Sequence, residues 1–124
     1  MKFAVLAALM AIALPAPVLA SDWVLVSTGV EGRKTFVDRQ SVRTTPNGYK
    51  RAWTKRIYPE IDKFGDNRVT VYQEFDCIQN RNRNLNAIYY SGERVTTTDV
   101  TVSEWVYVPP ETIGETLQKF VCRK

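Results

Sequence analysis

The sequence contains no histidine among its 124 residues. Because imidazole is the commonest metal ligand and the commonest general base near neutral pH, this absence disfavours a metal centre and histidine-assisted catalysis. No glycine-rich phosphate-binding loop, nucleophilic serine motif or Cys-x-x-Cys pair occurs either. Asp62 and Asp66 flank Gly65, but the regular acidic positions of a calcium loop are missing. We therefore predict a protein that is not an enzyme and has no cofactor and no metal.

The sequence also lacks a hydrophobic run long enough to span a bilayer. The shorter run Phe3–Leu14 follows the basic Lys2 and precedes two prolines and the small-residue pattern Val18-Leu19-Ala20. This arrangement is typical of a signal peptide over residues 1–20, cleaved after Ala20. The alternative, a buried N-terminal helix, is disfavoured by Pro15 and Pro17. No cysteine near the cleavage point could accept a lipid, so we expect residues 21–124 to be exported to a bacterial periplasm or secreted, without a stable membrane anchor.

Cysteine is scarce, with only Cys77 and Cys122. In an exported chain, two cysteines favour a disulfide over a metal site or a reactive thiol. Such a bond would contribute about 4 kcal/mol in the chain-entropy model. Two unpaired thiols, or pairing between chains, remain alternatives.

The excess of positive charge is small. Without Lys2, sixteen basic and thirteen acidic side chains leave a net charge of +3. Such a charge favours anionic surfaces mildly without requiring nucleic acid, so we predict no nucleic-acid partner.

The remaining residues follow the alternating pattern of strands. The predicted strands are Trp23–Ser27, Lys34–Asp38, Tyr49–Tyr58, Val69–Cys77, Leu85–Tyr90 and Arg94–Thr98, while Ile78–Asn84 is predicted to be a connection. After Pro109-Pro110, the Thr112-x-x-Glu115 spacing predicts a capping box and a C-terminal helix. The predicted fold is α+β, mainly β: a single antiparallel sheet of about six strands with the helix packed on one face, tied by a disulfide if the cysteines pair within the chain.

The predicted strand Val69–Cys77 organises this fold. Val69, Val71, Phe75 and Cys77 alternate onto one face, and this face is expected to lie in the core. In the helix, Ile113, Leu117, Phe120 and Val121 share a face that would cover the sheet.

Several short motifs together resemble the bacterial surface-adhesin protein E family over Trp23 to Cys122. They are Trp23, Phe36-Val37-Asp38, Trp53, Phe75-Asp76-Cys77, Arg81, Arg83, Tyr89-Tyr90, Gly92, Pro109 to Glu115 and Cys122. The resemblance implies a small antiparallel sheet, a disulfide joining it to a C-terminal helix, binding to host matrix and serum proteins, and a homodimer. The chain departs from the surface lipoprotein pattern because the lipid-bearing cysteine is absent.

Basic residues recur along the predicted strands. The candidate partner-binding basic surface consists of Arg51, Lys55, Arg81, Arg83 and Arg94. With the aromatic residues Trp53, Tyr58 and Tyr72 it could bind an anionic envelope polymer or an acidic protein patch. The alternative is an ordinary solvated face, whose cations prevent edge-to-edge pairing of strands.

Three functions remain open on the sequence alone. The favoured one is an exported, non-catalytic binding or envelope-associated protein that contacts an unidentified macromolecule through a sheet face or loops. The second is a small periplasmic hydrolase that uses Glu74 and Asp76, which share a strand face. Such pairs are common on solvated faces, where Arg81 or Arg83 would neutralise them. The third is a structural protein that acts as a dimer.

Overall fold

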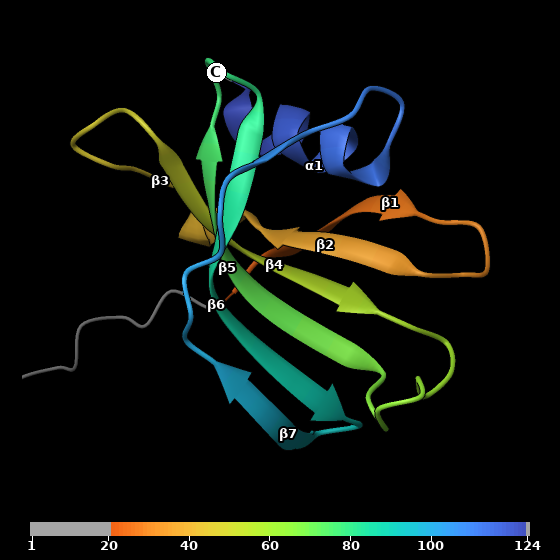
Figure 1. Cartoon of the computed structure of the whole chain (residues 1–124). Coiled ribbons are helices and arrows are strands. Elements are labelled where there is room, and N and C mark those ends of the chain that lie inside the picture. Colours follow the sequence, from red (N-terminus) through yellow and green to blue (C-terminus); the bar gives the residue numbers. More distant parts are fainter. Residues whose placement is uncertain (1–20, 124) are drawn as a thin grey trace, which may run out of the picture.

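A computed structural model of the chain describes residues 21–123 (Figure 1). Its elements are β1 Trp23–Thr28, β2 Lys34–Asp38, the 3-10 helix η1 Arg39–Ser41, β3 Arg43–Thr44, β4 Lys50–Ile57, β5 Arg68–Asp76, β6 Arg81–Ser91, β7 Arg94–Asp99, β8 Val106–Tyr107 and α1 Ile113–Cys122. The predicted signal peptide lies outside the described residues.

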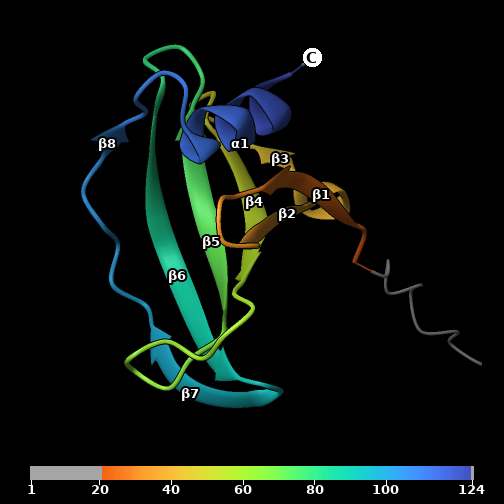
Figure 2. The ribbon, with the colours of Figure 1, turned by 90° about the vertical axis from the view of Figure 1, so that its right-hand side faces the viewer.

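The long strands form one antiparallel sheet in the order β1-β2-β4-β5-β6-β7. The two-residue strands β3 and β8 pair with β4 and β6. Figure 2 shows α1 on one side of the sheet and the chain from β7 to β8 running outside β6. The predicted fold, mainly β with one C-terminal helix, is confirmed.

Strand β6 begins earlier than the sequence predicted. The segment up to Asn84 was expected to be a connection, but pairing with β5 begins at Arg81, opposite Asp76. Arg83 lies opposite Glu74, so each basic residue faces a carboxylate on the neighbouring strand. Opposite charges across a strand pair stabilise the ladder, and this outweighs the weak strand propensity of asparagine. The turn is Cys77–Asn80, so Cys77 lies just after β5 and is exposed rather than ending a buried strand.

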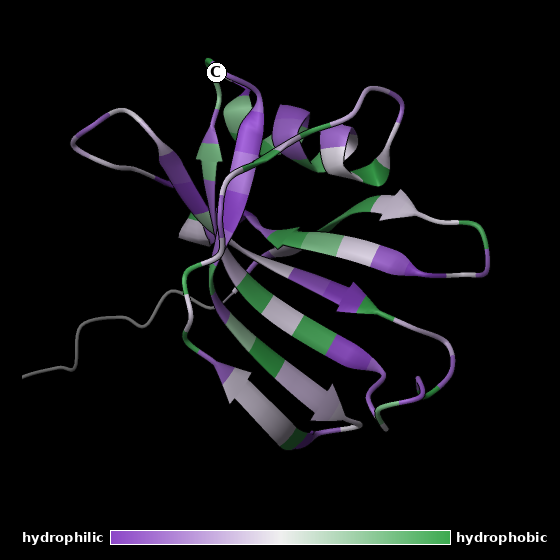
Figure 3. Ribbon diagram, in the orientation of Figure 1, coloured by the Kyte–Doolittle hydropathy of each residue, from purple (hydrophilic) through white to green (hydrophobic). Residues whose placement is uncertain are grey.

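The main core lies between α1 and the sheet. Leu117 and Val121 of the helix are buried against Val37, Ala52 and Phe75, which alternate onto one face of β2, β4 and β5. We call this side the helix face. Bands of opposite hydropathy alternate along these strands in Figure 3.

A second cluster of the helix face lies beyond the reach of α1. Val69, Val71 and Ala87 are buried there, with Tyr58 and Tyr89 packed against them. The core therefore continues along β5 without a covering helix, as the antiparallel arrangement allows.

The helix start is half of the predicted capping box. The Thr112 side-chain oxygen accepts a hydrogen bond from the Glu115 backbone N–H at 3.2 Å. The Glu115 carboxylate accepts from Lys119 at 3.1 Å, one turn further along the helix.

A disulfide attaches the end of α1 to the sheet. Cys77 and Cys122 are bonded, with Cα atoms 5.6 Å apart. The bond joins the turn after β5 to the last residue of the helix, and the predicted intramolecular pairing is confirmed. Gln118 strengthens the same junction, because its buried Nε2 donates to the carbonyl oxygens of Asp76 and Arg81.

Candidate functional site: the aromatic face of the sheet

The side of the sheet opposite the helix carries a concentration of aromatic side chains. It is formed by the strand positions that alternate with those of the helix face, and we call it the aromatic face. Its main residues are Trp23, Phe36, Trp53, Lys55, Arg68, Thr70, Tyr72, Ile88 and Tyr90. All of these side chains are half-buried, because no helix covers them.

An aromatic pair lies at the centre of this face. Trp53 on β4 is directly opposite Tyr72 on β5. Their ring centroids are 5.0 Å apart and the ring planes meet at 35°. Cross-strand aromatic pairs stabilise a sheet, so these rings hold one another in place.

Lys55 is held beside this pair by two further rings. Its Nζ lies 4.2 Å from the centroid of Trp23 and 5.1 Å from that of Phe36. Such cation–π contacts fix the ammonium group while leaving it charged. Partial burial, together with the positive charge of Arg68, lowers the pKa of Lys55 below its ordinary value.

Arg68 is fixed in a similar way on β5. Its guanidinium carbon lies 4.0 Å from the centroid of the Tyr90 ring. Its Nε is buried and has no hydrogen-bond partner among the described residues. Lys34 belongs to the same face, because it lies opposite Ile57, which in turn lies opposite Arg68. We call Lys34, Lys55 and Arg68 the cation cluster.

The carboxylates of this face are withdrawn from solvent. Among the described strands, those whose register places them on the aromatic face are Asp38, Glu74 and Asp76, exposed by 7%, 1% and 3%. Asp38 accepts from the backbone N–H groups of Asp22 and Gln40. Solvent at these strand positions therefore meets the cations and not the acids.

Glu74 is paired with two arginines. Arg51 donates to its Oε2 at 2.7 Å, and Arg83 donates to Oε1 at 2.7 and 3.0 Å. Trp105 lies over Arg83, with the guanidinium carbon 4.4 Å from the ring centroid. The buried carboxylate is thus fully paired, and its arginines are engaged on the protein itself.

Asp76 closes the turn between β5 and β6. Its Oδ1 accepts from the backbone N–H groups of Ile78 and Gln79, and its Oδ2 accepts from Arg81 at 3.0 Å. Burial alone would raise the pKa of Asp76, but these hydrogen bonds and the charge of Arg81 outweigh it and hold that pKa below its ordinary value.

The structure divides the predicted basic surface. Arg51, Arg81 and Arg83 do lie together, but each is paired with a buried carboxylate. Lys55 lies further along β4, in the cation cluster. Arg94 is exposed at the start of β7, opposite Ser91.

Arg68 was not among the basic residues that the sequence indicated as candidates for the site. Arg68 comes directly before the predicted strand Val69–Cys77, and the alternation of that strand puts it on the side opposite Val69 and Val71. The alternation along one strand does not predict which residue lies opposite on the next strand, so the contact of Arg68 with Tyr90 could not be predicted. Tyr58, expected near the basic surface, belongs to the helix face, where Arg33 lies 4.8 Å from its ring centroid.

The two carboxylates of the predicted catalytic pair, Glu74 and Asp76, are not accessible to a substrate. Glu74 and Asp76 are buried instead of solvated, although the arginines that neutralise them are those the sequence indicated. Both carboxylates already accept hydrogen bonds from arginine, so neither is free to transfer a proton to a substrate. This arrangement disfavours the hydrolase hypothesis.

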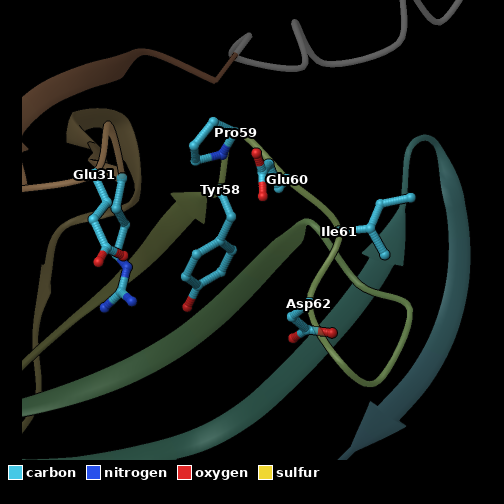
Figure 4. Close-up of a pocket in the computed structure, with 7 residues that line it drawn as sticks. Glu31, Tyr58, Pro59, Glu60, Ile61 and Asp62 are labelled. Atoms are coloured by element: carbon cyan, nitrogen blue, oxygen red, sulfur yellow. The ribbon is translucent and has the colours of Figure 1, made fainter.

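A hollow of about 500 Å³ lies away from the aromatic face. Figure 4 shows Tyr58 between Glu31 and the loop that carries Glu60, Ile61 and Asp62. Asp62 is used within its loop, where Oδ1 accepts from the backbone N–H groups of Phe64 and Asp66. In residues 21–123, no three acidic or cysteine side chains come together as a metal site.

The same part of the chain contains no helix with the length and apolar character needed to cross a bilayer.

The fold is a single antiparallel sheet with a disulfide-tethered C-terminal helix and an uncovered aromatic face. The model of the surface-adhesin protein E family matches residues 23–123, so the chain belongs to that family. This confirms the resemblance noted in the sequence. No curated protein matches the chain. No solved structure matches it either.

Proposed function

We propose that this protein is an exported, non-catalytic binding protein whose aromatic face contacts another macromolecule. Membership of an adhesin family and the disulfide are consistent with export to an oxidising compartment. We further propose that residues 1–20 are the signal peptide and that residues 21–124 form the adhesin-type domain.

The observation that carries the proposal is the composition of the uncovered face. Aromatic and arginine side chains are enriched at protein interfaces, because they bury a large area while keeping hydrogen-bonding groups. Here Trp53, Tyr72, Arg68 and Tyr90 are ordered by one another before any partner binds. Such preorganisation reduces the entropy lost on association.

Hydroxyl-radical footprinting of the disulfide-bonded protein tests this proposal. The protein is mixed in turn with host matrix proteins, serum proteins and envelope polysaccharides, and each mixture that forms a complex is oxidised briefly. We expect protection of Trp53, Tyr72 and Tyr90. Phe64 is exposed beside the helix-face residue Tyr89 and serves as the internal control. Protection confined to Phe64 would contradict the proposal.

A second candidate role, assembly as a homodimer, is supported by the outer edge of the sheet. Half of the large exposed hydrophobic side chains within residues 21–123 lie in β7, in β8 or in the segment that joins them: Val95, Val100, Val102, Val106 and Tyr107. All six residues of β7 are exposed, and β7 ends the order of the sheet. An uncovered edge strand with apolar neighbours favours pairing with another chain.

Light scattering over a concentration series tests the dimer. The substitutions Val100→Glu and Val102→Glu, made together, are expected to shift a dimer towards monomer. The matched control is Val30→Glu, because Val30 is exposed on the β1–β2 turn. A monomeric wild-type protein at high concentration, or equal dissociation in both variants, would contradict this role.

A further inference from the structure

We propose that the aromatic face binds an acidic polysaccharide, with the anionic groups on the cation cluster and the sugar rings against Trp53 and Tyr72. This inference rests on the proposed function, and it specifies the chemical class of the ligand.

The first argument is that the three cations of the cluster form no ion pair within the described residues. The ion pairs of the described residues use Arg39, Arg51, Arg81, Arg83 and Lys119. Lys34, Lys55 and Arg68 form none of them. Asp38 offsets part of the Lys55 charge, but Asp38, Glu74 and Asp76 are all buried, so the groups that a ligand meets on this face are the cations.

The second argument is that two of these cations repel one another while held in place. Partial burial and then the positive charge of Arg68 hold the pKa of Lys55 below its ordinary value, while the charge of Asp38 acts in the opposite direction. An anionic group bound between them would relieve this repulsion. The buried Nε of Arg68, which has no acceptor among the described residues, supplies a donor whose hydrogen-bonding capacity is unused.

The third argument is the spacing of the cations. Lys34, Ile57 and Arg68 are successive partners across β2, β4 and β5. The backbone positions of Lys34 and Arg68 are two strand spacings apart, a distance of about 10 Å. A charge on every second sugar of a linear polymer recurs at a comparable interval. A chain lying across the strands could therefore meet the cations in succession.

The aromatic pair favours sugar over an acidic polypeptide. A pyranose ring presents apolar C–H groups on its faces and hydroxyl groups at its edge. The rings of Trp53 and Tyr72 offer a polarisable surface, and their N–H and O–H groups offer hydrogen bonds at the rim. A polysaccharide combines this apolar surface with repeated negative charge.

Calorimetric titration of the disulfide-bonded protein tests the inference. The probes are sulfated heparin fragments and carboxylated oligogalacturonate, with neutral dextran of similar length as the uncharged control. Binding of either acidic probe, but not of dextran, is expected, and the two probes distinguish sulfate from carboxylate recognition. Affinity should weaken as salt is added, because exposed charges are screened over about 10 Å at 0.1 M ionic strength.

A pair of charge-matched variants locates the site. The double variant Lys55→Gln with Arg68→Gln is expected to bind at least about tenfold more weakly, because it removes two of the three clustered charges. The control, Lys119→Gln with Arg123→Gln, removes the same charge from exposed positions at the helix end. Circular dichroism and thermal unfolding confirm that each variant is folded.

Three outcomes would overturn the inference. The first is an absence of binding to both acidic probes at low salt, and the second is an equal loss of affinity in the two double variants. The third is that polyaspartate, titrated as an acidic polypeptide for comparison, binds as tightly as the acidic sugars. Any of these results leaves the proposed function intact if a protein partner protects Trp53, Tyr72 and Tyr90 in the footprinting experiment. The two proposals can therefore fail separately.

Discussion

Gln118 donates a hydrogen from its Nε2 to the carbonyl oxygen of Asp76 at 3.1 Å, across 42 residues of sequence. The same nitrogen lies 3.3 Å from the carbonyl oxygen of Arg81, and the Gln118 Oε1 accepts from Asn82. One buried side chain thus joins α1 to both strands of the β5–β6 hairpin. It is a polar contact within an otherwise apolar helix interface.

Replacing this glutamine should destabilise the protein. Gln118→Leu removes the partner of a buried carbonyl group, and we expect the free energy of unfolding to fall by about 2 kcal/mol. Urea denaturation followed by circular dichroism measures the change. Gln79→Leu makes the same substitution at an exposed position and should stay within about 0.5 kcal/mol. Equal effects of the two substitutions would show that the buried hydrogen bonds contribute little.

Reduction of the disulfide should lower the melting temperature. The Cys77–Cys122 bond restricts the unfolded chain and holds α1 against the sheet. A loss of about 2 kcal/mol would lower Tm by roughly 10 °C in a domain of this size. Scanning calorimetry with and without reductant measures the shift, and the double variant Cys77→Ser with Cys122→Ser should reproduce it. A reduced protein with unchanged Tm would contradict this expectation.

The buried carboxylate of Glu74 should matter more than an exposed one. Glu74→Gln removes the charge that pairs with Arg51 and Arg83, and we expect a loss of about 3 kcal/mol in stability. Glu115→Gln is the control, because its pair with Lys119 lies on the helix surface and such pairs contribute under about 0.5 kcal/mol. Chemical denaturation of both variants gives the comparison, and similar losses would refute the ranking.

The lowered pKa of Asp76 gives stability a defined pH dependence. A carboxyl group whose pKa is lower in the folded protein binds protons more readily when unfolded. Its contribution is complete above the unfolded pKa of about 3.9, and it is lost as pH falls through the folded pKa. Thermal unfolding from about pH 6 to about pH 2 should therefore show a shallower acid slope for Asp76→Asn than for the wild type. Identical slopes would contradict the assignment.

The strands of the sheet were predictable from the sequence where apolar and polar residues alternate. They were less predictable where ion pairs between strands determine how far a strand extends. The alternation of Val69, Val71 and Phe75 predicted the buried side of β5. The extension of β6 to Arg81 and Arg83 was not predicted, because polar residues near asparagines resemble a turn until their partners on β5 are known. Local propensity was outweighed by contacts that only the register defines.

The candidate site was only partly predictable for a related reason. A basic residue in a sequence does not reveal which carboxylate it pairs with. Arg51 and Lys55 share one side of β4, yet Arg51 is paired with Glu74 while Lys55 lies over Trp23 and Phe36. Some basic side chains are paired with a carboxylate of the protein and others are free to bind a ligand. The two kinds can be told apart only when the residues on the neighbouring strands are known.

The location of the disulfide has a consequence for biosynthesis. A ribosome makes Cys77 long before Cys122, since 45 positions separate them. The hairpins of β1 to β5 join neighbouring segments and can form in that interval, whereas α1 can dock only at the end. Until Cys122 has been added, Cys77 has no cysteine partner within the chain, so the disulfide can close only after the whole helix sequence has been made.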